Sequence, residues 1–117
     1  MLLAIPLKKG DMGLGSEVNQ HFSRSDFFAI IDISTEEVRL ERNPQAKIPG
    51  HDGTLSFLEG LGVERIACSG MGTPALLFAQ ELGMKVCYGR AGTAEEMLSM
   101  YKDGILENMV DGTRCRD

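Results

Sequence analysis

Two consecutive segments of this chain share the order strand, glycine turn, helix, and this near-repeat constrains the fold more than any other feature. The first contains the short apolar run 63–67, followed by the turn Cys68–Pro74 and an apolar helical segment. The second contains 84–86, followed by the turn Cys87–Thr93 and a further helical segment. Strands that alternate with helices are typical of α/β domains with parallel strands, so we expect that class here.

The two glycine turns are candidate anion-binding sites. Thr73 is a natural N-cap and Pro74 suits the first position of a helix, so the first turn should end at a helix N-terminus. Backbone N–H groups at such an end attract anions. The alternative is that the glycines only permit tight turns and close packing. Neither turn matches a nucleotide-binding motif. The candidate ligand-binding residues in the turns are Ser69, Gly70, Met71, Gly72, Gly89 and Gly92.

The remaining segments complete one domain. Residues 2–7 form an apolar run typical of a buried strand, and 27–33 with 37–41 have the pattern of a β-hairpin whose second strand is at the sheet edge. A long polar loop, 8–25, separates them from the first strand. Helices are expected over 54–60, 75–82 and from Ala94, where Thr93 and Glu96 match a capping box.

This order predicts a mixed five-stranded sheet with strand order 3-2-1-4-5, strand 2 antiparallel, and three helices. The domain should span residues 1–110, with a flexible C-terminal tail over 111–117. Strand one and the 63–67 strand become neighbours, so the loop after strand one should approach the first glycine turn. Open α/β sheets bind ligands in such a crevice.

Charge and composition exclude several classes of partner. The 117 residues have a net charge of −5, so no basic surplus exists to bind nucleic acid or an anionic membrane. No apolar run approaches the roughly 20 residues that a membrane helix needs. The three cysteines are odd in number and widely spaced, which favours a reducing, cytoplasmic setting over a disulfide framework. Cys115 is expected to be an exposed thiol in the tail.

Four side chains could add chemistry to the crevice. Arg24 offers a fork of donors suited to an anion, and His21 could be a metal ligand or proton carrier, or could bond only to its own loop. His51 is a second candidate metal ligand, or simply part of a helix N-terminal turn. Cys87 could offer a soft metal ligand, or be a buried small hydrophobe like Cys68. No nucleophile lies beside a histidine in a recognisable motif, and no catalytic carboxylate pair is evident, so nothing points to an enzyme.

Several motifs together resemble the dinitrogenase iron–molybdenum cofactor biosynthesis family, the small NifX-like and NifB C-terminal-like proteins. The resemblance covers about residues 1–107 and depends on motifs in the family's order and spacing. The chain departs from the family pattern at Ser23, Ser69 and Thr73 and lacks a histidine-rich insert. The motifs are Ala4-Ile5-Pro6, Val18-x-x-His21-Phe22-Ser23-Arg24, Phe28-Ala29-Ile30-Ile31-Asp32, Gly70-Met71-Gly72 and Gly89-Arg90-Ala91-Gly92-Thr93-Ala94-Glu95-Glu96.

The resemblance implies a ribonuclease-H-like three-layer fold and a role, related to nitrogen fixation in part of the family, in carrying an iron–sulfur or molybdenum-containing cluster. Such clusters are anionic, which suits the glycine turns, Arg24 and His21. The implied partners are proteins that donate and accept the cluster, and a weak homodimer is compatible with this role. Two alternatives stay open: a regulatory or scaffold domain that binds a protein through helix 75–82 without metal, and an enzyme acting on a small anionic substrate.

Overall fold

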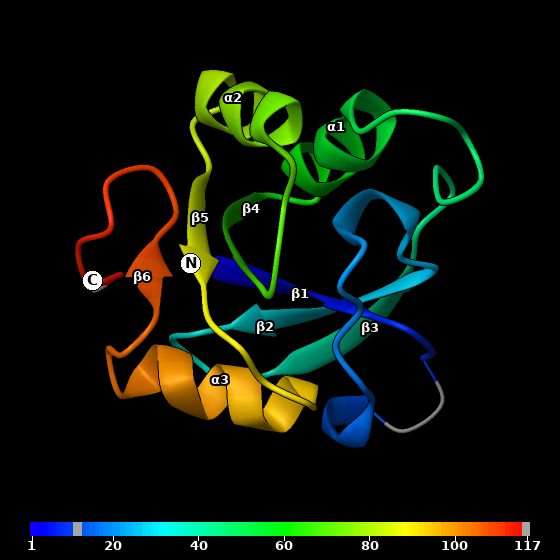
Figure 1. Cartoon of the computed structure of the whole chain (residues 1–117). Helices are drawn as coiled ribbons and strands as arrows, with labels where there is room; N and C mark the ends of the chain where they lie inside the picture. The colour runs from blue at the N-terminus through cyan, green and yellow to red at the C-terminus, as the bar shows by residue number, and fades with distance from the viewer. Residues whose placement is uncertain (11–12, 116–117) are drawn as a thin grey trace.

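A mixed six-stranded sheet forms the centre of the structure, a computed structural model that describes residues 1–10 and 13–115 (Figure 1). The strand order is β3-β2-β1-β4-β5-β6. Three helices cover the sheet, and two short 3-10 turns lie in the loop after the first strand. The strands are β1 (Leu2–Leu7), β2 (Phe27–Asp32), β3 (Val38–Arg42), β4 (Val63–Cys68), β5 (Lys85–Tyr88) and β6 (Glu107–Asn108). The helices are α1 (Asp52–Gly60), α2 (Thr73–Glu81) and α3 (Ala94–Lys102), and the 3-10 turns are η1 (Gly13–Gly15) and η2 (Phe22–Arg24).

The topology confirms the predicted order of the first five strands. β1, β4 and β5 are parallel, whereas β2 is antiparallel to both β1 and β3. The sixth strand, β6, was not predicted; it pairs antiparallel with β5 through Cys87–Asn108 and Tyr88–Glu107. A strand of two residues carries no periodicity, so only its tertiary contact with β5 defines it.

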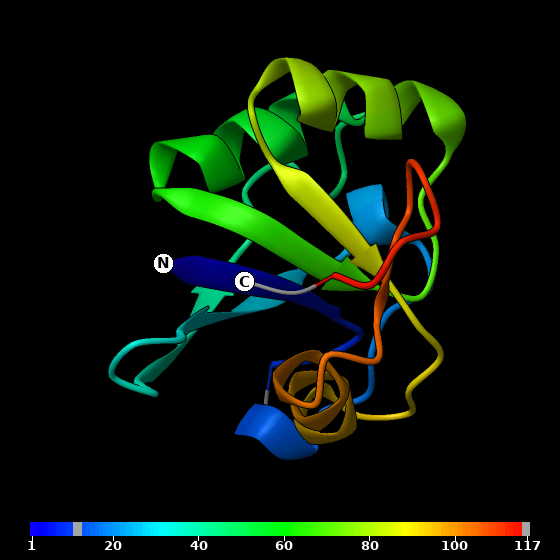
Figure 2. The ribbon, with the colours of Figure 1, turned by 90° about the vertical axis from the view of Figure 1, so that its left-hand side faces the viewer.

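The helices form separate layers on the two faces of the sheet, α1 and α2 on one and α3 on the other (Figures 1 and 2). Alternate residues of β1 pack on opposite faces of the sheet, because successive side chains of a strand point to opposite sides. Leu3, Ile5 and Leu7 pack in the core that contains Met97 of α3. Ala4 packs in the core that contains Leu58 of α1. The expected three-layer α/β fold is confirmed.

The observed N-cap residue is the predicted one at α3 but not at α2. Thr93 caps α3, since its hydroxyl accepts from the Glu96 N–H at 3.2 Å, as the capping box predicts. At α2 the prediction was wrong by one position: Gly72 is the N-cap, and its carbonyl accepts the first helical bond, from Leu76 N–H at 3.0 Å. Gly72 has extended dihedral angles and no side chain, so backbone geometry alone begins this helix.

Two of the three cysteines form a disulfide, which the sequence analysis did not expect. Cys87 of β5 is bonded to Cys115, and neither side chain is accessible to solvent. The predicted exposed thiol at Cys115 is therefore wrong. The Cys115 N–H also donates to Leu106 O at 2.7 Å, which brings this end of the chain against the sheet.

The division into a domain over 1–110 and a flexible tail over 111–117 stays a prediction. Residues 116–117, the last part of that tail, lie outside the described residues. None of the helices in 1–10 and 13–115 has the length and apolar character needed to cross a membrane.

Candidate functional site

The loop after β1 positions His21 through backbone bonds and leaves its imidazole exposed. The His21 N–H donates to Asn19 Oδ1 at 2.8 Å, and the His21 carbonyl accepts from the Ser25 hydroxyl at 3.3 Å. The next residue, Phe22, is buried with its ring 5.5 Å from that of Phe28. Phe22 therefore anchors the loop in the core. Within the described part of the chain the bonds of His21 to its own loop are made by its backbone, and no hydrogen bond of its imidazole is present.

This loop and the first glycine turn enclose a hollow of about 250 Å³. The sheet order explains their meeting, because β1 and β4 are parallel neighbours and both segments leave their carboxyl ends. His21 and Arg24 thus lie beside the Gly70–Gly72 turn, as the strand order predicted. The lining residues are Gln20, His21, Phe22, Ser23, Arg24, Gly70, Met71, Gly72 and Ala75.

Backbone N–H groups and the exposed Arg24 side chain make this hollow suited to an anion. Among the described residues, the N–H groups of Met71 and Gly72 donate to no other residue. They lie at the N-terminal end of α2, where the helix dipole favours negative charge. Arg24 is the cation that lines the same hollow.

Cys68 lies directly before this turn, but its thiol is not available as a ligand. Its side chain is fully buried, and burial raises the pKa of the thiol to about 11, although a hydrogen bond from the Gly70 N–H partly opposes that shift. The thiol is therefore protonated near neutral pH. The interpretation of Cys68 as a buried hydrophobe is confirmed.

A second hollow, of about 430 Å³, lies beside the first at the other glycine turn. The two candidate residues Ser69 and Gly92 line it, and Gln20 lines both hollows. Arg90 and Glu96 also line this hollow, although neither was predicted as a site residue; the signal available in the sequence was that Arg90 lies within the second glycine turn. The full lining is Gln20, Ser69, Tyr88, Arg90, Ala91, Gly92 and Glu96.

Gly89, a candidate binding residue, lines neither hollow. A Cβ at this position would lie 2.4 Å from Leu106 Cδ2 and 3.1 Å from Met100 Cε. Its carbonyl accepts from the Ser69 hydroxyl at 3.0 Å. At this position the structure supports the packing interpretation of the glycine turn, because a side chain would collide with the core.

The three candidate metal ligands do not meet. His21 lines the first hollow, whereas His51 lies at the start of α1 with its Nε2 2.8 Å from Asp52 Oδ1. Cys87 is buried in the disulfide, so it offers no thiolate. In 1–10 and 13–115 no group of three or more His, Cys, Asp or Glu side chains is arranged to hold a metal ion. The hollow therefore fits a preformed anionic group with one imidazole contact, and does not fit a bare metal ion.

The chain is similar to known proteins both in its sequence family and in its structure. The family model described as dinitrogenase iron-molybdenum cofactor matches residues 1–104. A Thermotoga protein with a provisional NifB assignment, solved by NMR, has 30% sequence identity and a TM-score of 0.81, with 97% of each chain covered. No curated protein matches the chain.

Two further solved structures share the fold at lower identity. The apo form of the orange protein from Desulfovibrio gigas has a TM-score of 0.83 at 19% identity, covering 93% of this chain and 92% of its own. A provisionally assigned dinitrogenase from Methanocaldococcus jannaschii has a TM-score of 0.65 at 16% identity, covering 94% and 95%. At these identities the likeness concerns the fold alone.

Proposed function

The chain belongs to the dinitrogenase iron–molybdenum cofactor family, and from this premise we propose that it is a non-catalytic carrier for an anionic iron–sulfur or molybdenum-containing cluster. The cluster is cargo, received from a donor protein and passed to an acceptor during metallocluster assembly. The observation that carries this proposal is the first hollow, where Arg24, His21 and the Gly70–Gly72 turn at the start of α2 line one space.

The size of the hollow favours a compact inorganic group. Its volume of about 250 Å³ is below the range of about 300–1,000 Å³ that is usual for organic ligands and cofactors. Charge-assisted hydrogen bonds from Arg24 and backbone N–H groups would act on the anionic sulfur or oxygen atoms of a cluster. These contacts need no covalent bond to the protein.

The same donor set explains why binding should be transient. The described lining of the first hollow contains one imidazole and no thiolate, whereas resident iron–sulfur clusters are usually held by several cysteines. A single His21–metal bond supplemented by hydrogen bonds would leave most positions of the cluster open to an acceptor protein. A carrier requires this property.

The test is cluster uptake under anaerobic conditions, measured as bound metal and sulfide per chain together with the visible spectrum. The full chain should take up one molybdenum–iron–sulfur cluster. His21→Ala and Arg24→Ala should each raise the dissociation constant for the cluster at least about tenfold, a loss of at least about 1.4 kcal/mol of binding free energy.

His51→Ala is the matched control, because it removes an imidazole that lies outside the hollow. It should bind the cluster as the unchanged chain does. Equal loss of uptake in His21→Ala and His51→Ala, or no uptake by the unchanged chain, would contradict the carrier proposal.

One observation favours a second function, a regulatory or scaffold domain that binds a protein through α2. Leu77 in that helix is 55% exposed, and Leu76 and Phe78 beside it are only partly buried, so α2 presents adjoining apolar side chains that a partner could cover. If this function holds, Leu77→Ser should weaken partner binding while His21→Ala leaves it unchanged.

A further inference from the structure

β3 is an edge strand of the sheet, and none of the described residues pairs with its outer side. The opposite edge is different: β6 has only two residues, and Asn108 N–H donates to Thr113 O at 2.7 Å, so the following turn covers it. β3 has five residues, and Val38 and Leu40 are each 38% exposed. An edge strand of this kind presents free N–H and C=O groups to another strand.

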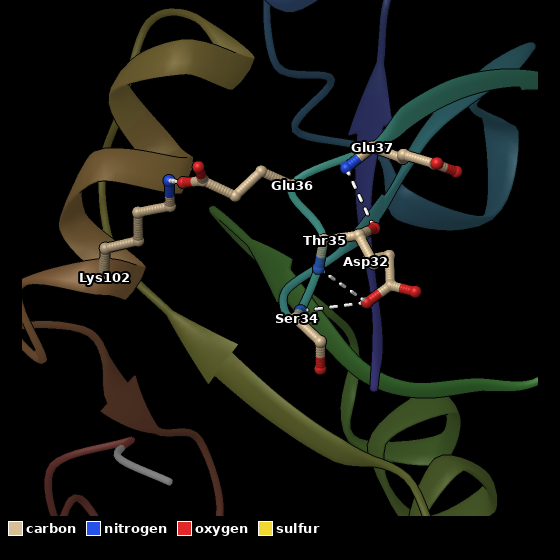
Figure 3. Close-up of polar contacts among 6 residues, drawn as sticks. All are labelled: Asp32, Ser34, Thr35, Glu36, Glu37 and Lys102. Atoms are coloured by element: carbon tan, nitrogen blue, oxygen red, sulfur yellow. Dashed lines mark hydrogen bonds and ion pairs between the residues drawn. The ribbon is translucent and has the colours of Figure 1, made fainter.

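Polar contacts hold the turn that joins β2 to β3 (Figure 3). The Asp32 carboxylate accepts from the Ser34 N–H at 2.9 Å, and Glu36 N–H donates to Asp32 O at 2.7 Å. Lys102 of α3 pairs with Glu36 in the same turn and lowers the pKa of that carboxyl. The turn is thus held both by its own bonds and by α3.

The register shows which backbone groups point outward. Asp32 N–H donates to Glu37 O at 2.9 Å, and Asn43 N–H donates to Asp26 O at 2.8 Å. In an antiparallel pair, alternate residues exchange both of their bonds with the neighbour. Odd-numbered residues of the 37–43 segment therefore bond inward to β2. The N–H and C=O groups of Val38, Leu40 and Arg42 point outward.

Charge and strand length together favour one antiparallel pairing of this edge with itself, centred on Leu40, because Leu40 is the middle residue of β3. In an antiparallel pairing centred on Leu40, the two Leu40 residues lie opposite each other, and Val38 of each copy lies opposite Arg42 of the other. The outward N–H and C=O groups of the two strands then face each other. The same pairing places Arg39 of each copy opposite Glu41 of the other copy. Centring on Arg39 or on Glu41 would instead set like charges opposite each other, which is destabilising.

Apolar contact supports the same register. Leu40 pairs with Ala29 and Val38 pairs with Ile31, so both side chains lie on the α3 face of the sheet. In the pairing centred on Leu40, the two exposed Leu40 side chains meet at the centre. Arg39 and Glu41 lie on the opposite face, where they are 3.9 Å apart within one chain. Each face of the joined edge is thus complementary to itself.

We propose that two copies of this chain associate through β3, antiparallel and centred on Leu40, to form one continuous sheet with a two-fold axis at that residue. The interface is isologous, as in most homodimers. Because one five-residue strand buries little surface, the association should be weak and reversible, with a dissociation constant between about 1 μM and 1 mM. The proposal is independent of cluster binding, since β3 contributes no residue to the first hollow.

The first experiment is sedimentation equilibrium of the full chain over a range of concentrations. The average mass should rise from 12.8 kDa toward twice that value as concentration increases. Arg39→Glu and Glu41→Arg should each stay monomeric, because each places like charges across the axis. The double variant Arg39→Glu/Glu41→Arg should dimerise again, because the charges are exchanged and remain complementary.

Mixing the two single variants tests the register. Each variant repels itself, but Arg39→Glu and Glu41→Arg complement each other when paired around Leu40, so an equimolar mixture should form the heterodimer. Circular dichroism confirms that each variant is folded. A native chain that stays monomeric near 1 mM, or single variants that dimerise as well as the native chain, would overturn the proposal.

Discussion

At the scale of single residues, a substitution at Gly89 can show whether this glycine is needed for core packing or for ligand binding. Gly89→Ala should lower the free energy of unfolding by about 1–3 kcal/mol, because the added Cβ would lie 2.4 Å from Cδ2 of the fully buried Leu106. Urea-induced unfolding followed by circular dichroism measures this change.

Gly60→Ala is the matched control for that substitution. Apart from its chain neighbours and the α1 backbone, no atom of the described residues lies within 4 Å of a Cβ at this position, and Gly60 ends α1, so alanine should leave stability unchanged or raise it by up to about 1 kcal/mol. If Gly89→Ala keeps native stability but loses cluster uptake, Gly89 is a binding residue and the packing explanation is wrong.

The sequence could indicate His21 and Arg24 because their meeting with Gly70–Gly72 follows from strand order alone. It could not indicate Cys115, because the pairing with Cys87 depends on how the chain turns after α3. Arg90 and Glu96 were missed for a similar reason. They share a hollow with Gln20 only once the loop after β1 is placed against the second glycine turn.

At the scale of secondary structure, the start of α3 depends on a side chain and the start of α2 does not. Thr93→Ala should destabilise the protein by about 1 kcal/mol, because the Thr93 hydroxyl accepts the Glu96 N–H at the helix N-terminus. Thr73→Ala, at the position that the sequence favoured as the α2 cap, should change stability by less than about 0.5 kcal/mol. Thermal unfolding of both variants gives the comparison, and equal effects would contradict the assigned caps.

The elements that local sequence could predict are those with a strong pattern of their own. β1 and β2 are nearly continuous apolar runs, and α3 combines apolar residues at helical spacing with a capping box. The positions of these three elements agree closely with the prediction. β6 has no such pattern, since Glu107 and Asn108 become a strand only by pairing with β5. The N-cap at Gly72 likewise depends on backbone conformation, which residue preferences alone did not identify.

At the scale of the whole molecule, the Cys87–Cys115 disulfide attaches the end of the chain to the sheet. It joins residues 28 apart in sequence and lies in the core on the α3 face. A cross-link restricts the unfolded chain more than the folded one, which raises stability. A reducing compartment, which the cysteine pattern predicts, disfavours this bond. The free energy of unfolding should therefore be lower in the reduced chain than in the oxidised chain.

Reduction should therefore lower the free energy of unfolding by about 2–4 kcal/mol, measured in urea with and without a dithiol reductant. Cys68→Ala should respond to the reductant as the unchanged chain does, whereas Cys115→Ala should not respond. The denatured, unreduced protein should present one free thiol, that of Cys68. Three free thiols would show that the bond is absent.

Reduction should leave cluster uptake unchanged, because Cys87 lines neither hollow. If reduction instead increases uptake, and Cys87→Ala abolishes that increase, then Cys87 is a cluster ligand.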